Sequence, residues 1–104
     1  MLEAAREAES FVRGRDRTEL GRDRMLAFAL VRCIEIIGEA GARVNAETRQ
    51  KHPAVPWANI VAMRNRLIHA YFDIDLDRVW DTVAHDLPFL ISELEKVLRE
   101  EGGP

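Results

Sequence analysis

The feature that most constrains the fold is a long amphipathic pattern near the end of the chain. Apolar residues recur there at steps of three and four, at Leu76, Val79, Trp80, Val83, Leu87, Leu90, Ile91, Leu94, Val97 and Leu98. This spacing predicts a long helix with one buried face. Asp75 is placed to cap its first turn, and Pro88 removes one backbone donor, so we expect a kink in this helix.

The first half of the chain also predicts helices. Leu2, Ala5, Ala8, Phe11 and Val12 share one helical face, and Gly14 is expected to end that helix. Thr18 is expected to cap a short turn through Leu20. A long helix is predicted from about Gly21 to Val44, and the apolar run at residues 25–31 predicts burial on all its sides.

After Asn45 the pattern predicts one further turn at residues 47–51 and then another helix. Pro56 suits the first position of that helix, because its missing N–H would have no partner there. The helix is expected to end near His69 to Tyr71, and no segment of the chain predicts a strand. Residues 1–104 are therefore expected to form a single all-α domain, a bundle of four to five helices with a kinked C-terminal helix.

The composition excludes several classes of protein. It is 47% hydrophobic and 32% charged, which argues against disorder. The longest apolar run has seven residues, whereas a membrane span needs roughly 20. Charged residues near the start argue against a secretory signal. The single cysteine, Cys33, cannot form an internal disulfide, so we expect a reduced, cytoplasmic setting.

The net charge of −3 argues against a protein that coats nucleic acid, but the charge is unevenly spread. Residues 43–69 carry five basic residues and one acidic one, whereas residues 73–101 carry nine acidic and three basic residues. The basic region has enough charge to bind a few phosphates. On charge alone, two surfaces that pair with each other are the simpler explanation.

Position 64 is unusual within the helix that follows Pro56. The apolar face of that helix reads Trp57, Ile60, Val61, position 64, Leu67, Ile68 and Tyr71, yet position 64 is Arg. A charge that faces a core costs several kcal/mol unless it is paired. The ordinary explanation is a salt bridge from Arg64 to Glu35 or Glu39.

A second face of the same helix holds Ala58, Ala62, Asn65 and His69. The two alanines would let another helix approach closely. Positions 64 and 69 lie about 140° apart around an ideal helix, so they do not share a face. They can converge if the helix loosens after Leu67, or across a two-fold axis between two copies of the chain. For His69 alone, a histidine that caps or packs is the simpler interpretation.

These residues resemble the HepT-like toxins, a branch of the HEPN superfamily. Arg64, His69 and Tyr71 match the R-x4-H-x-Y signature of that group. Residues 36–40, 52–57, 63–69 and 75–80 also resemble the family in its order, so the resemblance covers nearly the whole chain. It implies a HEPN-like helical bundle.

The resemblance also implies an activity, that of a metal-independent endoribonuclease toxin of a type II toxin–antitoxin system. Such proteins are homodimers in which two motif helices form a composite cleft for RNA, without metal or cofactor. His69 would move protons, because a histidine titrates near neutral pH. Arg64 would stabilise charge on the phosphate. Asn65 would orient His69 or donate to phosphate, and Glu39 would support the site by fixing Arg64.

The resemblance gives Tyr71 a separate role. The cognate antitoxin of this group is a minimal nucleotidyltransferase that transfers AMP from ATP to the tyrosine of the H-x-Y element. The added group would block RNA and change the local charge. On spacing alone, Tyr71 is a packed core residue.

Two other functions stay open. The chain could be a catalytically silent helical dimer that binds a nucleotidyltransferase, or a purely structural dimerisation domain. The pair His85-Asp86 invites comparison with metal-dependent phosphohydrolases, but further ligands are not found, so it is interpreted as an exposed helical pair. His52, His69, His85 and Cys33 show no spacing typical of a metal site.

Overall fold

A computed structural model of the chain describes residues 1–70 and 73–101, with the backbone alone for residues 64, 68–70 and 73. The elements in chain order are α1 (Leu2–Val12), α2 (Arg17–Arg22), α3 (Arg24–Ala42), α4 (Ala46–Lys51), α5 (Trp57–Leu67), β1 (Ile68–Ala70), β2 (Asp73–Ile74), α6 (Leu76–Asp81), the π-helical turn η1 (Thr82–Asp86) and α7 (Leu87–Glu101). Because α6, η1 and α7 follow one another directly, α1, α3, α5 and this segment are the four long helical pieces of the described chain. The predicted all-α bundle is confirmed.

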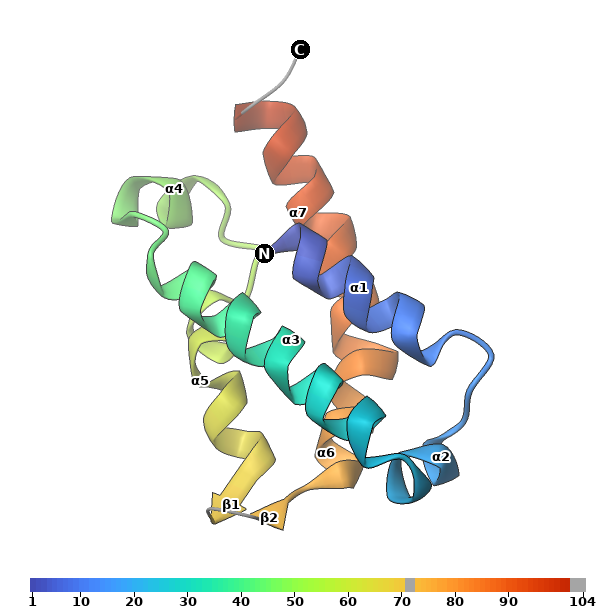
Figure 1. The fold of residues 1–104 in the computed structure, drawn as a ribbon. Coiled ribbons are helices and arrows are strands. Elements are labelled where there is room, and N and C mark those ends of the chain that lie inside the picture. Colours follow the sequence, from blue (N-terminus) through green and yellow to red (C-terminus); the bar gives the residue numbers. More distant parts are fainter. Residues whose placement is uncertain (71–72, 102–104) are drawn as a thin grey trace.

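Helix α3 is the centre of the bundle and lies between α1 and α5 (Figure 1). The side chains that are at most 1% exposed include Leu30, Ile34 and Ile37 of α3, Ile60 and Leu67 of α5, and Val79, Val83 and Leu87 of the last segment. Burial of each such side chain contributes roughly 1.5–3 kcal/mol. The core therefore ties α5 to both α3 and the C-terminal segment. No described helix is long and apolar enough to cross a membrane.

The predicted helix from Gly21 to Val44 is interrupted at Asp23. The carboxylate of Asp23 accepts a hydrogen bond from the backbone N–H of Leu26 (3.0 Å) and another from Arg15 (3.0 Å), so α2 ends and α3 begins there. The prediction of burial on all sides is also wrong. Met25 is 83% exposed and Phe28 is 50% exposed, because α1 and α5 cover only part of the surface of α3.

Several predicted helix boundaries are confirmed. Gly14, with φ +75°, follows the end of α1, and Asn45 caps α4 by accepting from the backbone N–H of Thr48 (2.8 Å). Asp75 caps α6 by accepting from the N–H of Arg78 (3.0 Å), and α5 begins directly after Pro56. A residue with a short polar side chain before a helix satisfies one of the free N–H groups of the first turn, which explains these caps.

The expected irregularity of the last helix is a π-turn placed just before Pro88. The N–H of Leu87 donates to the carbonyl of Thr82, five residues back, and the Thr82 hydroxyl donates to the carbonyl of Arg78 (2.8 Å). Proline has no N–H to bond the carbonyl of Ala84, so regular α-helical pairing cannot continue through it. The π-turn accommodates the proline within one continuous helical segment.

The motif helix is shorter than predicted. Helix α5 ends at Leu67, and Ile68–Ala70 and Asp73–Ile74 form a short antiparallel pair at the lower end of Figure 1, with Ile68 opposite Ile74. The expectation of no strand is therefore wrong at these few residues. The carbonyl of Leu67 accepts from the N–H of Asp75 (2.6 Å) rather than from a further helical turn, and this bond links the end of α5 to the start of α6.

Candidate active site at the end of α5

The position of α5 is set by close packing against two glycines of α3. A Cβ atom at Gly38 would lie 3.2 Å from the carbonyl oxygen of Ile60, and one at Gly41 would lie 2.9 Å from Cγ2 of Ile60. These positions therefore let the α5 backbone and its branched side chain approach α3 more closely than a larger residue would allow. At the start of α5, the indole N–H of Trp57 donates to the carbonyl of His52 (3.0 Å).

The two predicted catalytic residues lie on different kinds of backbone. Arg64 belongs to α5, and His69 is the central residue of β1, two residues after the helix ends. The angle of about 140° calculated for an unbroken helix therefore does not apply to them. Loosening after Leu67 was one of the two ways in which Arg64 and His69 were expected to converge. Their side chains, and all of Tyr71, lie outside the described part of the structure, so their convergence stays a prediction.

The outer face of α5 is open and carries small side chains. Ala58, Val61 and Asn65 are exposed, and Ala62 is half-buried. A surface of alanine and valine lets a second helix pack at short distance, as the prediction of a dimer requires. Asn65 lies on this face, one residue after Arg64.

Glu39, predicted to support the site, lies on α3 and is exposed. Its Oε1 is 3.7 Å from Nη1 of Arg32, and both side chains are more than half exposed. An ion pair of this kind contributes little to stability because water screens it. Glu39 is therefore not committed to a strong partner, and the predicted contact with Arg64 stays a prediction.

None of the described arginine and lysine side chains of residues 43–69 lies at ion-pair distance from an acidic residue of 73–101, so the predicted pairing of the two regions is not found for them. His52 lies between Glu100 (3.4 Å) and Glu101 (3.0 Å) of α7. Arg49 instead donates to the carbonyls of Gly41 and Val44, and Lys51 lies 3.4 Å from Glu47. Arg66 donates to the amide oxygen of Asn59 (3.1 Å).

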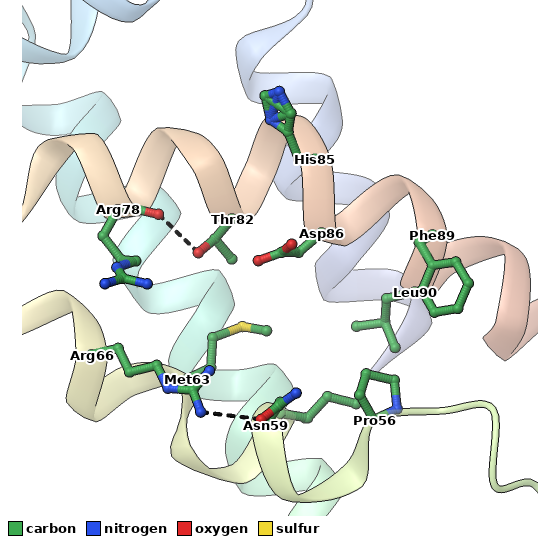
Figure 2. A pocket seen from close by; sticks show the side chains of 11 residues that line it. Pro56, Asn59, Met63, Arg66, Arg78, Thr82, His85, Asp86, Phe89 and Leu90 are labelled. Carbon is green, nitrogen blue, oxygen red and sulfur yellow. Dashed lines mark hydrogen bonds between the residues drawn. The ribbon is translucent and has the colours of Figure 1, made fainter.

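A cavity of about 330 Å³ lies between α5 and the C-terminal segment, and sequence reasoning missed it. It is lined by Pro56, Asn59, Ile60, Met63 and Arg66 on one side and by Arg78, Thr82, His85, Asp86, Phe89 and Leu90 on the other (Figure 2). The available signal was the spacing of Arg78, Thr82 and Asp86, four residues apart on one helical face. Among the described residues, no three His, Cys, Asp or Glu side chains are grouped to hold a metal ion.

Comparison of the sequence with known proteins identifies the family of this chain. The family model described as "Ribonuclease HepT-like" matches residues 1–97. The chain is 40% identical to a Methanocaldococcus jannaschii protein named "Putative RNase MJ1380", over 93% of this chain and 89% of that protein. It is 41% identical to the "Probable ribonuclease HepT" of Thermococcus cleftensis, over 72% of this chain and 68% of that protein. No solved structure matches the chain significantly. With a family match over nearly its whole length, the chain belongs to the HepT-like ribonuclease family.

Proposed function

We propose that this protein is a metal-independent endoribonuclease and the toxin of a type II toxin–antitoxin pair. The observation that carries the proposal is the position of the R-x4-H-x-Y signature in a chain of this family. Arg64 lies in the last turns of α5, and His69 follows where the helix has changed to a strand. This change of backbone removes the helical geometry that would hold the two residues on different faces.

The reaction that suits these residues is attack by the ribose 2′-hydroxyl on the neighbouring phosphorus. A bond forms between O2′ and phosphorus, and the bond from phosphorus to O5′ breaks, which leaves a 2′,3′-cyclic phosphate and a 5′-hydroxyl. A histidine can take the proton of the 2′-hydroxyl or give a proton to O5′, because it exchanges protons near neutral pH. His69 is assigned this role. The guanidinium of Arg64 stabilises the charge that builds on the non-bridging oxygens.

A homodimer would supply the second proton-transfer group. The exposed face of α5 with Ala58, Val61 and Asn65 supports packing of α5 against its copy across a two-fold axis. One His69 would then act as base and the other as acid in a shared cleft. Asn65 would orient His69 or donate to phosphate, and Glu39 would hold Arg64 in place.

Inhibition would come from a nucleotidyltransferase antitoxin that modifies Tyr71. The phenolic oxygen of Tyr71 forms a bond to the α-phosphorus of ATP, the phenolic proton is lost, and pyrophosphate leaves. The adenylyl group adds bulk and negative charge two residues from His69, so it repels and blocks an RNA phosphate. A Tyr71→Phe variant is expected to escape the antitoxin, with no mass increase of one adenylyl group after incubation with antitoxin and ATP. Modification of Tyr71→Phe to the wild-type extent would contradict this role.

The proposed activity is tested with purified protein and transfer RNA or total RNA in excess EDTA. Wild-type protein is expected to produce fragments with 2′,3′-cyclic phosphate ends, and Arg64→Ala and His69→Ala to produce none. Arg43→Ala is a matched control, because Arg43 is an exposed basic residue on the turn after α3. Each variant is first checked for its helical circular dichroism. A folded, dimeric wild type that leaves every RNA intact would refute the proposal and favour a silent dimer that binds a nucleotidyltransferase.

A further inference from the structure

The cavity between α5 and the C-terminal segment has a polar and an apolar end. Figure 2 shows Arg66 and Arg78 at one end, and Pro56, Leu90 and Phe89 at the other. Asn59 and Asp86 lie between these two groups. A cavity of about 330 Å³ with an apolar wall and a few placed polar groups is typical of small-ligand sites.

Arg66 and Arg78 form no ion pair with another described side chain, although the carboxylate of Asp86 lines the same cavity. Arg66 donates to the neutral amide of Asn59, and within the described part of the chain neither Arg66 nor Arg78 lies at ion-pair distance from a carboxylate. They come from two different helices, α5 and α6, which the core holds together. Two cations at one end of a cavity repel each other, and an anion between them changes this repulsion into attraction. Guanidinium groups suit phosphate oxygens in particular, because they donate two parallel hydrogen bonds.

The opposite end offers a surface for a flat apolar group. Phe89 is 52% exposed, as are Phe28 (50%) and Phe11 (39%), but of these three it alone lines this cavity. Leu90 is 2% exposed and Met63 is 8% exposed, so they form the floor of the cavity. Proteins that bind single-stranded nucleic acid combine cationic side chains with exposed aromatic rings. The phosphates contact the cations, and the bases stack on the rings.

The groups of the C-terminal segment share one helical face. Arg78, Thr82, Asp86 and Phe89 follow one another at steps of four, four and three residues, and Thr82 and Asp86 belong to η1. Phe89 lies three residues after η1 and still lines the same cavity as Arg78, which lies before η1. The Thr82 hydroxyl is already bonded to the carbonyl of Arg78, so it supports the wall of the cavity.

We propose that this cavity binds one nucleotide unit, with its phosphate between Arg66 and Arg78 and its base against Phe89. Only the choice of an RNA strand as the source of that nucleotide rests on the proposed function. Arg66 is three residues before His69, so their Cα atoms are at most about 11 Å apart. A nucleotide held at Arg66 therefore flanks the proposed cleavage position, and Asn59 and Asp86 offer oxygen acceptors to its sugar or base.

Binding is measured by fluorescence anisotropy with a labelled single-stranded pentanucleotide made of 2′-deoxynucleotides, which the proposed reaction cannot cleave. The double variant Arg66→Gln, Arg78→Gln is expected to bind at least about tenfold more weakly than wild type, with a shallower dependence on salt by up to about 1.4 in log–log slope. Phe89→Leu is expected to weaken binding by about tenfold, through loss of stacking. Arg99→Gln, on exposed α7 surface away from the cavity, is the matched control for loss of charge and is expected to bind like wild type.

Equal affinity of wild type, the double arginine variant and Phe89→Leu would overturn the proposal. Free AMP as a competitor tests the source of the nucleotide. Displacement of the pentanucleotide by AMP at equal concentration would overturn the assignment to a strand, and weak competition would support it.

The cleavage assay separates this proposal from the proposed function. In an active enzyme the double arginine variant is expected to raise KM with little change in kcat, whereas His69→Ala lowers kcat. Loss of binding in a protein that cleaves no RNA would support the cavity and refute the ribonuclease. Cleavage of RNA by the double variant with a normal KM would support the ribonuclease and refute the cavity as a binding site for the RNA.

Discussion

The close packing of α3 on α5 predicts that alanine at position 41 destabilises the protein. In an unconstrained helix, a change from glycine to alanine stabilises by about 1 kcal/mol. At Gly41 the added Cβ would lie 2.9 Å from Cγ2 of Ile60, which is fully buried, so one of the two helices must shift. Overpacking of this kind costs roughly 1–3 kcal/mol.

Gly21 is the matched control, because it also lies within a helix and a Cβ there meets nothing within 4 Å. The gain in helix propensity is then common to both variants, so the difference between Gly41→Ala and Gly21→Ala isolates the overpacking, about 1–3 kcal/mol. In urea denaturation followed by circular dichroism, this corresponds to a midpoint roughly 1 M lower for Gly41→Ala. All proteins are compared at one concentration, since a dimer would make the midpoint depend on it.

A midpoint for Gly41→Ala equal to or above that of Gly21→Ala would refute the close-packing argument. A double-mutant cycle gives a further check. In an Ile60→Ala background the atom nearest the new Cβ is absent, so Gly41→Ala should cost less there than in wild type. Additive effects would show that the cost arises elsewhere.

Three further results are expected. Hydrogen bonds from the N–H of Leu26 and from Arg15 lower the pKa of Asp23. This carboxylate therefore stabilises the fold above its ordinary pKa of 3.8, and the contribution is lost as pH falls through the folded pKa. In an acid titration, Asp23→Asn keeps a cap but has no charge, so it should lose less stability than wild type below about pH 4. Burial raises the pKa of the Cys33 thiol. A thiol reagent at neutral pH should therefore label Cys33 far more slowly in the folded protein than in the urea-unfolded protein. Equal labelling rates would contradict the burial of Cys33. Asn45→Ala removes the acceptor that caps α4 and should cost about 1 kcal/mol in urea denaturation, whereas Asn45→Asp should cost little.

The helices could be predicted from the sequence because local chemistry decides them. Caps at Asn45 and Asp75 and the apolar face of the last helix depend on neighbours within one or two turns. The break between α2 and α3 at Asp23 was not predicted, because the residues around it also continue a helical pattern. Its capping role depends in part on Arg15, which lies on another segment.

Features that depend on how elements meet were not predictable. The exposure of Met25 depends on which sides of α3 its neighbours cover. The strand pair of residues 68–70 and 73–74 is too short to give a periodic pattern. The spacing of Arg78, Thr82 and Asp86 shows that they share a face, but the cavity also depends on the register between α5 and the C-terminal segment, which no local rule supplies.

The blocks of sequence that resemble the HepT-like family contain residues with different physical roles. Residues 36–40 contributed to it, and the structure shows that Gly38 in this block permits close approach of α5. Its contribution is thus to position the motif helix, and not to provide chemistry. Family signatures of this kind combine packing and catalytic positions, so each residue still needs its own geometric argument.

Arg64 and Arg66 illustrate this distinction. Positions 64 and 66 lie about 200° apart around α5, so they belong to nearly opposite sides of the helix. Arg66 lines the cavity, and Arg64 is the arginine that we propose for the reaction. If Arg66 binds the RNA and Arg64 acts in the reaction, substitutions of Arg66 should change the affinity for RNA, and substitutions of Arg64 should change the rate of cleavage. The two arginines would then be separable by kinetics, although only one residue lies between them in the sequence.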